Sequence, residues 1–180
     1  MKKVKILLAA LLSITVVLGT AVPTYAASSE VNIEVKATDM NVSVTVPSTL
    51  PIIFNSDGTN TLPTNWTIEN LSAIAGIHLS EITMDAQETG WKLLADAVNV
   101  EELSADTKAI KFSVGKEGAL KLVVADGESS PTGAVSFGET EISIPSGDTQ
   151  VLSFDVERGA FTETAASAKA FDMVLNFNFN

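Results

Sequence analysis

Residues 171–179 read Phe-Asp-Met-Val-Leu-Asn-Phe-Asn-Phe, which is the clearest periodic stretch of the chain. Apolar side chains occupy every odd position, whereas three of the four even positions hold Asp or Asn. A period of two places the apolar residues on one face of a β-strand and the polar residues on the other. This end of the chain is therefore predicted to form a strand that has one face in a hydrophobic core.

Similar runs precede this strand along the chain and are separated by Gly-, Pro- and Asn-rich turns. We expect strands within segments 31–35, 42–46, 52–54, 66–68, 77–84, 91–93, 110–114, 120–124, 134–137, 141–144 and 151–156. About nine to eleven strands, with turns every ~8–12 residues, predict an all-β fold: a single antiparallel β-sandwich or jelly-roll-like domain. The apolar phase shifts by one residue between Leu79 and Ile82, which predicts a β-bulge there. Residues 100–103 are expected to form one helical turn.

The expected core consists of the apolar residues that share the inner face of these strands. They are Val42, Val44, Val46, Trp66, Ile68, Ile77, Leu79, Trp91, Leu93, Phe112, Val114, Leu152, Phe154, Phe171, Met173, Leu175 and Phe177.

The N-terminal segment 1–26, MKKVKILLAALLSITVVLGTAVPTYA, has the features of a cleaved secretory signal peptide. Three lysines are followed by an apolar run, Pro23, and small residues at the −3 and −1 positions of a cleavage site after Ala26. We expect a secreted protein whose β-sandwich domain spans residues 27–180. No second apolar segment reaches the ~20 residues that span a bilayer, so we expect no transmembrane anchor.

Charge and cysteine content narrow the expected partners. Residues 1–26 contain three of the 11 basic residues and none of the 22 acidic residues. The remaining chain therefore has 8 basic residues and a net charge of −14. Such an acidic surface disfavours nucleic acid and anionic lipid, and serves solubility more readily than cation binding. The chain has no cysteine, which excludes disulfides and thiolate chemistry. A cysteine-free exported chain with a short Lys-rich leader fits a Gram-positive bacterium.

Motifs for catalysis and for cofactors are missing from the sequence. His78 is the single histidine, and its alternation with Ile77 and Leu79 predicts a surface position on the outer face of a strand. Neither GxSxG nor HExxH accompanies it, and the carboxylates form no glycosidase signature. Residues 55–60 hold oxygen ligands that suit Ca²⁺, but they lack the spaced acids of an EF-hand loop. We expect no enzyme activity, no catalytic residue and no cofactor, and a turn at 55–60.

Two tryptophans are the candidate binding residues. Exposed aromatic rings stack on sugars in carbohydrate-binding modules, and Trp66 or Trp91 could do this if it lay on the surface. Both occupy alternating apolar positions, where a core tryptophan is the more common outcome. The core interpretation is favoured, and a glycan-binding module remains the alternative.

The segment Gly90-Trp91-Lys92-Leu93, with the signal peptide, the acidic β-rich body and Val-Thr-Val-Pro-Ser at 44–48, resembles Gram-positive surface proteins with WxL-type domains. The resemblance covers residues 41–95 and implies non-covalent binding to the cell wall or to other surface proteins. It would assign binding roles to Trp91 and Leu93. A second Trp-x-Leu motif is usual near the C-terminus of such domains, where this chain reads Val174-Leu175-Asn176-Phe177.

The strand-forming ends, residues 31–35 and 171–179, are also similar to those of secreted β-sandwich subunits that polymerise into biofilm fibres. A terminal strand can complete the sheet of a neighbouring molecule, although pairing within its own domain is the more common outcome. Together these features predict a non-enzymatic cell-surface or matrix protein. It would act by association with the cell wall or by self-assembly into a homo-oligomer.

Overall fold

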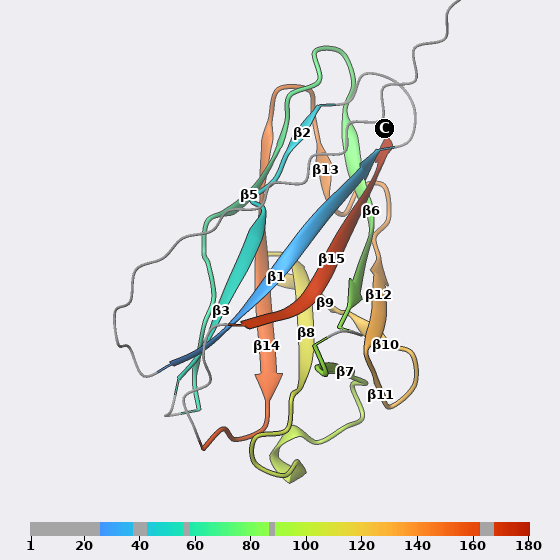
Figure 1. Ribbon diagram of the computed structural model, residues 1–180. Coiled ribbons are helices and arrows are strands. Elements are labelled where there is room, and N and C mark those ends of the chain that lie inside the picture. Colours follow the sequence, from blue (N-terminus) through green and yellow to red (C-terminus); the bar gives the residue numbers. More distant parts are fainter. Residues whose placement is uncertain (1–25, 38–42, 56–57, 87–88, 163–167) are drawn as a thin grey trace, which may run out of the picture.

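The alternating segments form two β-sheets that pack face to face around one hydrophobic core (Figure 1). The computed structural model describes residues 26–37, 43–55, 58–86, 89–162 and 168–180. Within these ranges the chain forms fifteen strands and one 3-10 helix, η1 (Val100–Glu102), and it forms no α-helix. The all-β sandwich is therefore confirmed. Apart from Ala26, the predicted leader lies outside the described residues.

One sheet has eight strands and the other has seven. The first runs in the order β10 (Val124–Ala125), β12 (Thr132–Ser136), β6 (Ile77–Asp85), β15 (Ala168–Phe179), β1 (Ala26–Ala37), β3 (Thr49–Asn55) and β4 (Asn60–Thr61), with β13 (Ser143–Ile144) also paired to β6. The second runs β11 (Ser129–Ser130), β7 (Lys92–Leu94), β8 (Ala109–Lys116), β14 (Thr149–Arg158), β5 (Trp66–Asn70) and β2 (Val44–Thr45), with β9 (Ala119–Leu122) also paired to β8. Ten strands exceed two residues, in agreement with the predicted number.

Two strand pairs depart from the expected antiparallel arrangement. β7 pairs with β8 in parallel, and β1 pairs with β15 in parallel. Parallel neighbours need a long connection, usually of a dozen residues or more. Residues 95–108, which include η1, make that connection between β7 and β8, and almost the whole domain separates β1 from β15. The sheets are therefore mixed, and no long helix is needed for either crossover.

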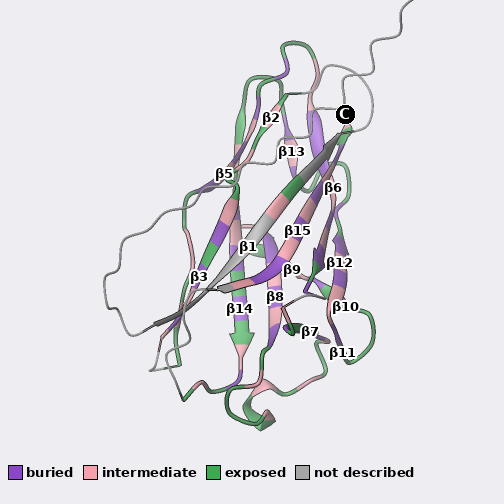
Figure 2. Ribbon diagram, in the orientation of Figure 1, coloured by how far each residue is buried: buried purple, intermediate pink, exposed green. Residues whose placement is uncertain are grey.

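The core lies between the sheets and is built as the alternation predicted (Figure 2). Fourteen of the seventeen expected core residues are buried. Val44 and Val46 are half-buried and pack against the core, and Val42 lies outside the described residues. Inner-face positions of β15 show the alternation most clearly, since Phe171, Met173 and Leu175 are each at most 1% exposed.

The predicted β-bulge is present in β6. Its register with β15 shifts because Asn176 pairs with Glu81 while Phe177 pairs with Leu79, which leaves Ser80 unpaired in this ladder. The Ser80 hydroxyl donates to the Asn176 carbonyl at 2.9 Å, and the Ser80 carbonyl accepts from the Phe137 N–H at 2.8 Å. The extra residue allows both Leu79 and Ile82 to face the core.

The prediction that His78 lies on the surface is wrong, because this residue is only 5% exposed. Its Nδ1 lies 2.9 Å from Oδ1 of Asn180, and the Asn180 amide donates to the Ser143 hydroxyl at 2.7 Å. The Asn180 N–H also donates to the Gly76 carbonyl at 3.1 Å. The last residue of the chain thus covers the imidazole on the outer face of β6, which a pattern of neighbours in sequence cannot reveal.

Two local predictions concern short segments. The helical turn expected at 100–103 is confirmed by η1, and the Asn99 side chain caps it by accepting from the Glu101 N–H at 3.1 Å. The turn expected at 55–60 leads into β4, which begins at Asn60 and pairs with β3. No helix of the described ranges has the length and apolar character to cross a membrane.

Candidate functional site

The feature that sets this sandwich apart is the position of its N-terminal strand. β1 lies between β3 and β15, so the first strand of the chain fills the middle of the eight-stranded sheet (Figure 1). It is antiparallel to β3 and parallel to β15. We call the space between β3 and β15 the β1 slot. The first strand and the last strand of the described chain are therefore direct neighbours.

The two edges of the β1 slot bind different parts of β1. Residues 26–32 pair with β3, and residues 29–37 pair with β15. Only 29–32 are paired on both sides, so β1 joins two strands that are staggered along its length. Loss of β1 would leave the backbone groups of both edges without these partners, and an unpaired strand edge is a template for another strand.

A register shift in β15 adapts the slot to β1. Glu30 pairs with Lys169 whereas Val31 pairs with Phe171, so Ala170 has no partner in β1. The Ala170 carbonyl instead accepts a 2.6 Å hydrogen bond from the Thr89 hydroxyl. The irregularity is thus fixed by a side chain from outside the ladder.

β1 brings apolar residues into register with buried positions of β15. Ile33 of β1 packs against the core and is registered with Met173, which is 1% exposed. The neighbouring registered pairs place Val31 opposite Phe171 and Val35 opposite Leu175. Backbone pairing along two edges and apolar positions on one face are the two elements of β-strand addition. The arrangement can therefore bind an extended apolar-polar strand.

The tryptophan and leucine positions proposed for binding are all buried. Trp66 is 3% exposed, Trp91 is 8% exposed and Leu93 is 0% exposed. The indole N–H of Trp66 donates to the Thr49 carbonyl at 3.1 Å, which fixes β5 against the start of β3. The core interpretation is confirmed for all three residues, and neither indole ring offers an open face for stacking on a sugar.

Trp91 belongs to an aromatic cluster rather than to a surface motif. Its ring centroid lies 5.8 Å from that of Phe54, 6.0 Å from that of Phe161 and 6.2 Å from that of Phe171. Leu93 packs so close to Gly133 that a Cβ added at the glycine would lie 2.8 Å from Leu93 Cδ1. The Trp-x-Leu segment therefore supports packing between the two sheets.

Oxygen-rich segments do not gather into a metal-binding group among the described residues. In the turn that follows β3, the Asn55 amide donates to the Thr59 and Thr61 hydroxyls at 2.9 and 3.3 Å. Asp57, one of the oxygen ligands considered for calcium, lies outside the described residues. The contacts seen at Asn55 are those of a turn.

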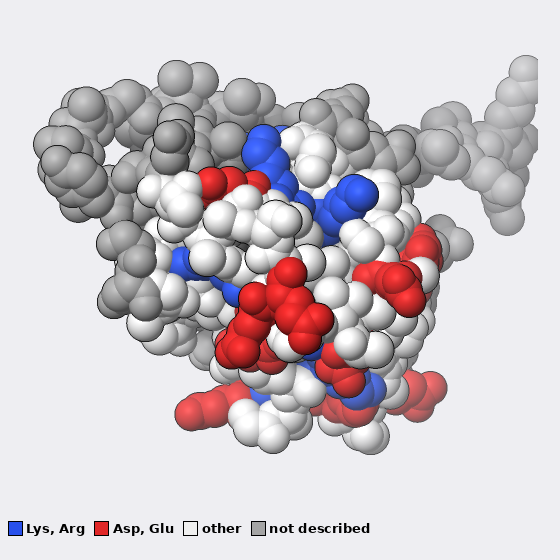
Figure 3. Space-filling model, turned by 90° about the horizontal axis from the view of Figure 1, so that it is seen from below, with Lys and Arg blue, Asp and Glu red and all other residues white. Residues whose placement is uncertain are grey.

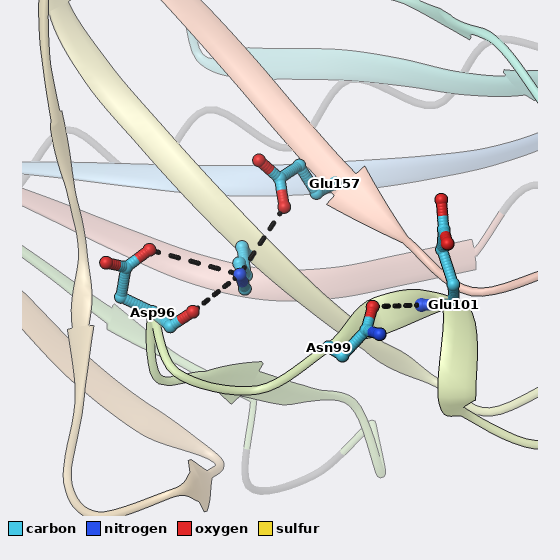
Figure 4. Close-up of polar contacts among 5 residues, drawn as sticks. Asp96, Asn99, Glu101 and Glu157 are labelled. Atoms are coloured by element: carbon cyan, nitrogen blue, oxygen red, sulfur yellow. Dashed lines mark hydrogen bonds and ion pairs between the residues drawn. The ribbon is translucent and has the colours of Figure 1, made fainter.

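Acidic side chains gather at the end of the sandwich that carries η1, with basic side chains between them (Figure 3). Lys111 forms ion pairs with Asp96 and Glu157, which Figure 4 labels. Its ammonium lies 2.7 Å from the Asp96 carbonyl oxygen, 3.9 Å from the Asp96 carboxylate and 3.5 Å from the Glu157 carboxylate. The ammonium therefore forms ion pairs with both carboxylates.

Glu141 is an exposed carboxylate whose pKa is lowered. The hydrogen bond from Lys121 is the main reason that the pKa of Glu141 is lowered, and the Gly138 N–H adds to the effect. The Lys121 ammonium lies 2.6 Å from Glu141 Oε2, and it also stands 5.5 Å from the centre of the Phe137 ring. This pair fastens the loop after β12 to β9 and is a structural contact.

The buried polar residue that the sequence did not single out is Asn70, at the end of β5. It is 0% exposed, and its amide group donates to the carbonyls of Ala75, Ile144 and Pro145 at 2.9, 3.0 and 3.1 Å. Its Oδ1 accepts from the Ser72 N–H at 3.0 Å. An Asn at the end of a strand signals a turn, but only the tertiary structure shows that this one organises three segments.

Comparisons with known proteins add no relative from which a function could be taken. No family model matches the chain, and neither a curated protein nor a solved structure matches it.

Proposed function

We propose that this chain is a non-enzymatic extracellular protein of a Gram-positive cell surface or matrix, and that it acts through self-assembly. The observation that carries the proposal is the location of the N-terminal strand β1 in the middle of a sheet. A sheet that is completed by a chain terminus can also be completed by the terminus of another copy.

Export supports the same function. The predicted cleavage after Ala26 would make Ala27 the first residue of the mature chain, and β1 spans Ala26–Ala37. Cleavage would therefore leave β1 as a terminal strand, free of the preceding leader. Such a strand can enter or leave a sheet without threading the rest of the chain.

Association with the cell wall is the second form that this surface role could take. The Trp-x-Leu resemblance motivated it, yet Trp91 and Leu93 are buried and cannot themselves contact a wall polymer. A glycan-binding role would likewise need a surface other than Trp66 and Trp91. Self-assembly is favoured because the position of β1 between β3 and β15 supports it.

Size-exclusion chromatography with light scattering tests the proposal on the exported chain over a range of protein concentrations. We expect species that grow with concentration. A monomer at every concentration would overturn self-assembly, and sedimentation with purified cell wall would then separate wall association from release.

A further inference from the structure

We infer that the partner of this protein is a second copy of itself, which donates its β1 strand into the β1 slot of its neighbour. The inference rests on the proposed self-assembly and specifies its interface: β1 of one copy between β3 and β15 of the next, with the register seen within the chain. The donated strand makes the same contacts whether it pairs within its own chain or with a second copy. Exchange between copies therefore keeps every strand pairing of the sheet.

The parallel pairing of β1 with β15 sets the geometry of such an assembly. Ala37 is registered with Phe177, so β1 leaves the slot at the end of the sheet where β15 ends (Figure 1). The donor domain would therefore stand beyond that end of the acceptor. Its own slot would remain open to a third copy. This contact is heterologous, so its repetition gives a filament with one direction when the rotation between successive copies does not close into a ring.

The connection between β1 and β2 limits how far apart the copies can stand. Residues 38–43 join Ala37 to Val44. Six residues span at most about 20 Å when fully extended. A donor domain would thus lie directly against its acceptor, which favours a compact row of sandwiches over beads on a long tether.

Pairing within one chain competes with donation, because a tethered strand has a high effective concentration. The net charge of −14 on residues 27–180 adds repulsion between copies. Assembly should therefore increase with protein concentration and with ionic strength, since salt screens like charges on neighbouring copies.

The absence of cysteine from the sequence permits a direct test with two single-cysteine variants. Asn32 of β1 is registered with Thr49 of β3. Exported Asn32→Cys and Thr49→Cys chains would be unfolded together, refolded together at high concentration and oxidised. Within one chain neither variant can form this disulfide, so a disulfide-linked heterodimer reports donation between chains. Random head-to-tail pairing would place the two cysteines together at about one interface in four.

Two controls make the result specific. Asn32→Cys mixed with Thr67→Cys, whose cysteine lies on β5 of the other sheet, should give at least tenfold less heterodimer. The double variant Asn32→Cys/Thr49→Cys should give a ladder of disulfide-linked oligomers when assembled.

The outcomes separate this inference from the proposed function. Heterodimers in the first mixture, well above the Thr67→Cys control, would support strand donation. Donation would be overturned if light scattering showed assemblies, the first mixture gave no such heterodimers, and the double variant cross-linked only within single chains. Self-assembly would still stand in that case. A monomer that never assembles would overturn both.

Discussion

The guanidinium carbon of Arg158 lies 4.9 Å from the ring centre of Phe54, and the two residues belong to opposite sheets of the sandwich. The ring of Phe161 lies 5.1 Å from the same carbon. Arg158 also donates to Asn60 Oδ1 at 2.9 Å and to the Asn55 carbonyl at 2.7 Å. The single arginine of the chain thus fastens the end of β14 to the β3–β4 hairpin.

Replacing Arg158 with methionine should lower the free energy of unfolding by about 2–3 kcal/mol, because hydrogen bonds from a charged donor and two ring contacts are lost. Arg158→Lys should recover less than half of this loss, since an ammonium lacks the planar fork. Urea denaturation of both variants measures the difference. Equal stability of the lysine variant and the original protein would show that charge alone matters at this position.

Leu175→Asp should prevent folding. Leu175 is 0% exposed and is registered with Ile82 of β6 and Val35 of β1, so the new carboxylate would be buried without a partner. That penalty, several kcal/mol or more, is comparable to the whole stability of a small domain. Circular dichroism and thermal melting measure the effect. Val174→Asp is the matched control on the half-buried opposite face and should fold, whereas a folded Leu175→Asp protein would contradict the described core.

Asn70→Asp should destabilise the protein by about 2–4 kcal/mol although it changes almost no volume. The substitution replaces an amide donor with an oxygen that would face the carbonyls of Ala75, Ile144 and Pro145. Chemical denaturation measures the loss near neutral pH. Asn65→Asp, at an exposed position, serves as the control and should change stability little. Equal effects of both substitutions would show that the Asn70 hydrogen bonds are not important for folding.

The Lys121–Glu141 pair predicts a small contribution to the free energy of unfolding that depends on pH. Because the pKa of Glu141 is lowered in the folded protein, its carboxylate stabilises the fold above the ordinary pKa of glutamate. This contribution is lost as the pH falls through the lowered pKa. The stability difference between the original protein and Glu141→Gln should therefore be present near neutral pH and vanish in strong acid.

Thermal melting over a pH series measures this difference, and Glu139→Gln, an exposed neighbour, is its control. High salt should reduce the effect because the pair is exposed. A difference that persists unchanged into strong acid would contradict the assignment to the Glu141 carboxylate.

The burial of Trp66 and Trp91 predicts blue-shifted tryptophan emission that iodide quenches poorly. Unfolding in urea should raise the quenching constant severalfold as both indoles reach water. Soluble glycans should leave quenching of the folded protein unchanged. Strong protection by one class of glycan would restore the glycan-binding alternative and place an indole at its site.

The alternation of residues 171–179 and of the shorter segments predicted the strands, the core and the all-β class without tertiary information. Period-two patterning fixes which side chains share a face, so the bulge in β6 was visible as a one-residue phase shift. Turn residues likewise marked most strand boundaries. These properties are local, and for that reason the sequence determined them.

Pairing partners were decided only by the tertiary structure, because nothing local in residues 26–37 specifies which strands will flank them. The burial of His78 could not be predicted for the same reason. The alternation placed this residue on the outer face of its strand, but the residue that covers it, Asn180, is far away in sequence. Asn70 shows it again, since the carbonyls that it joins include Ile144 and Pro145. The sequence by itself determined which residues turn inward, through the period of the strand. The order of the strands, and with it the β1 slot, follows from long-range backbone hydrogen bonding and burial that exist only once the two sheets have packed.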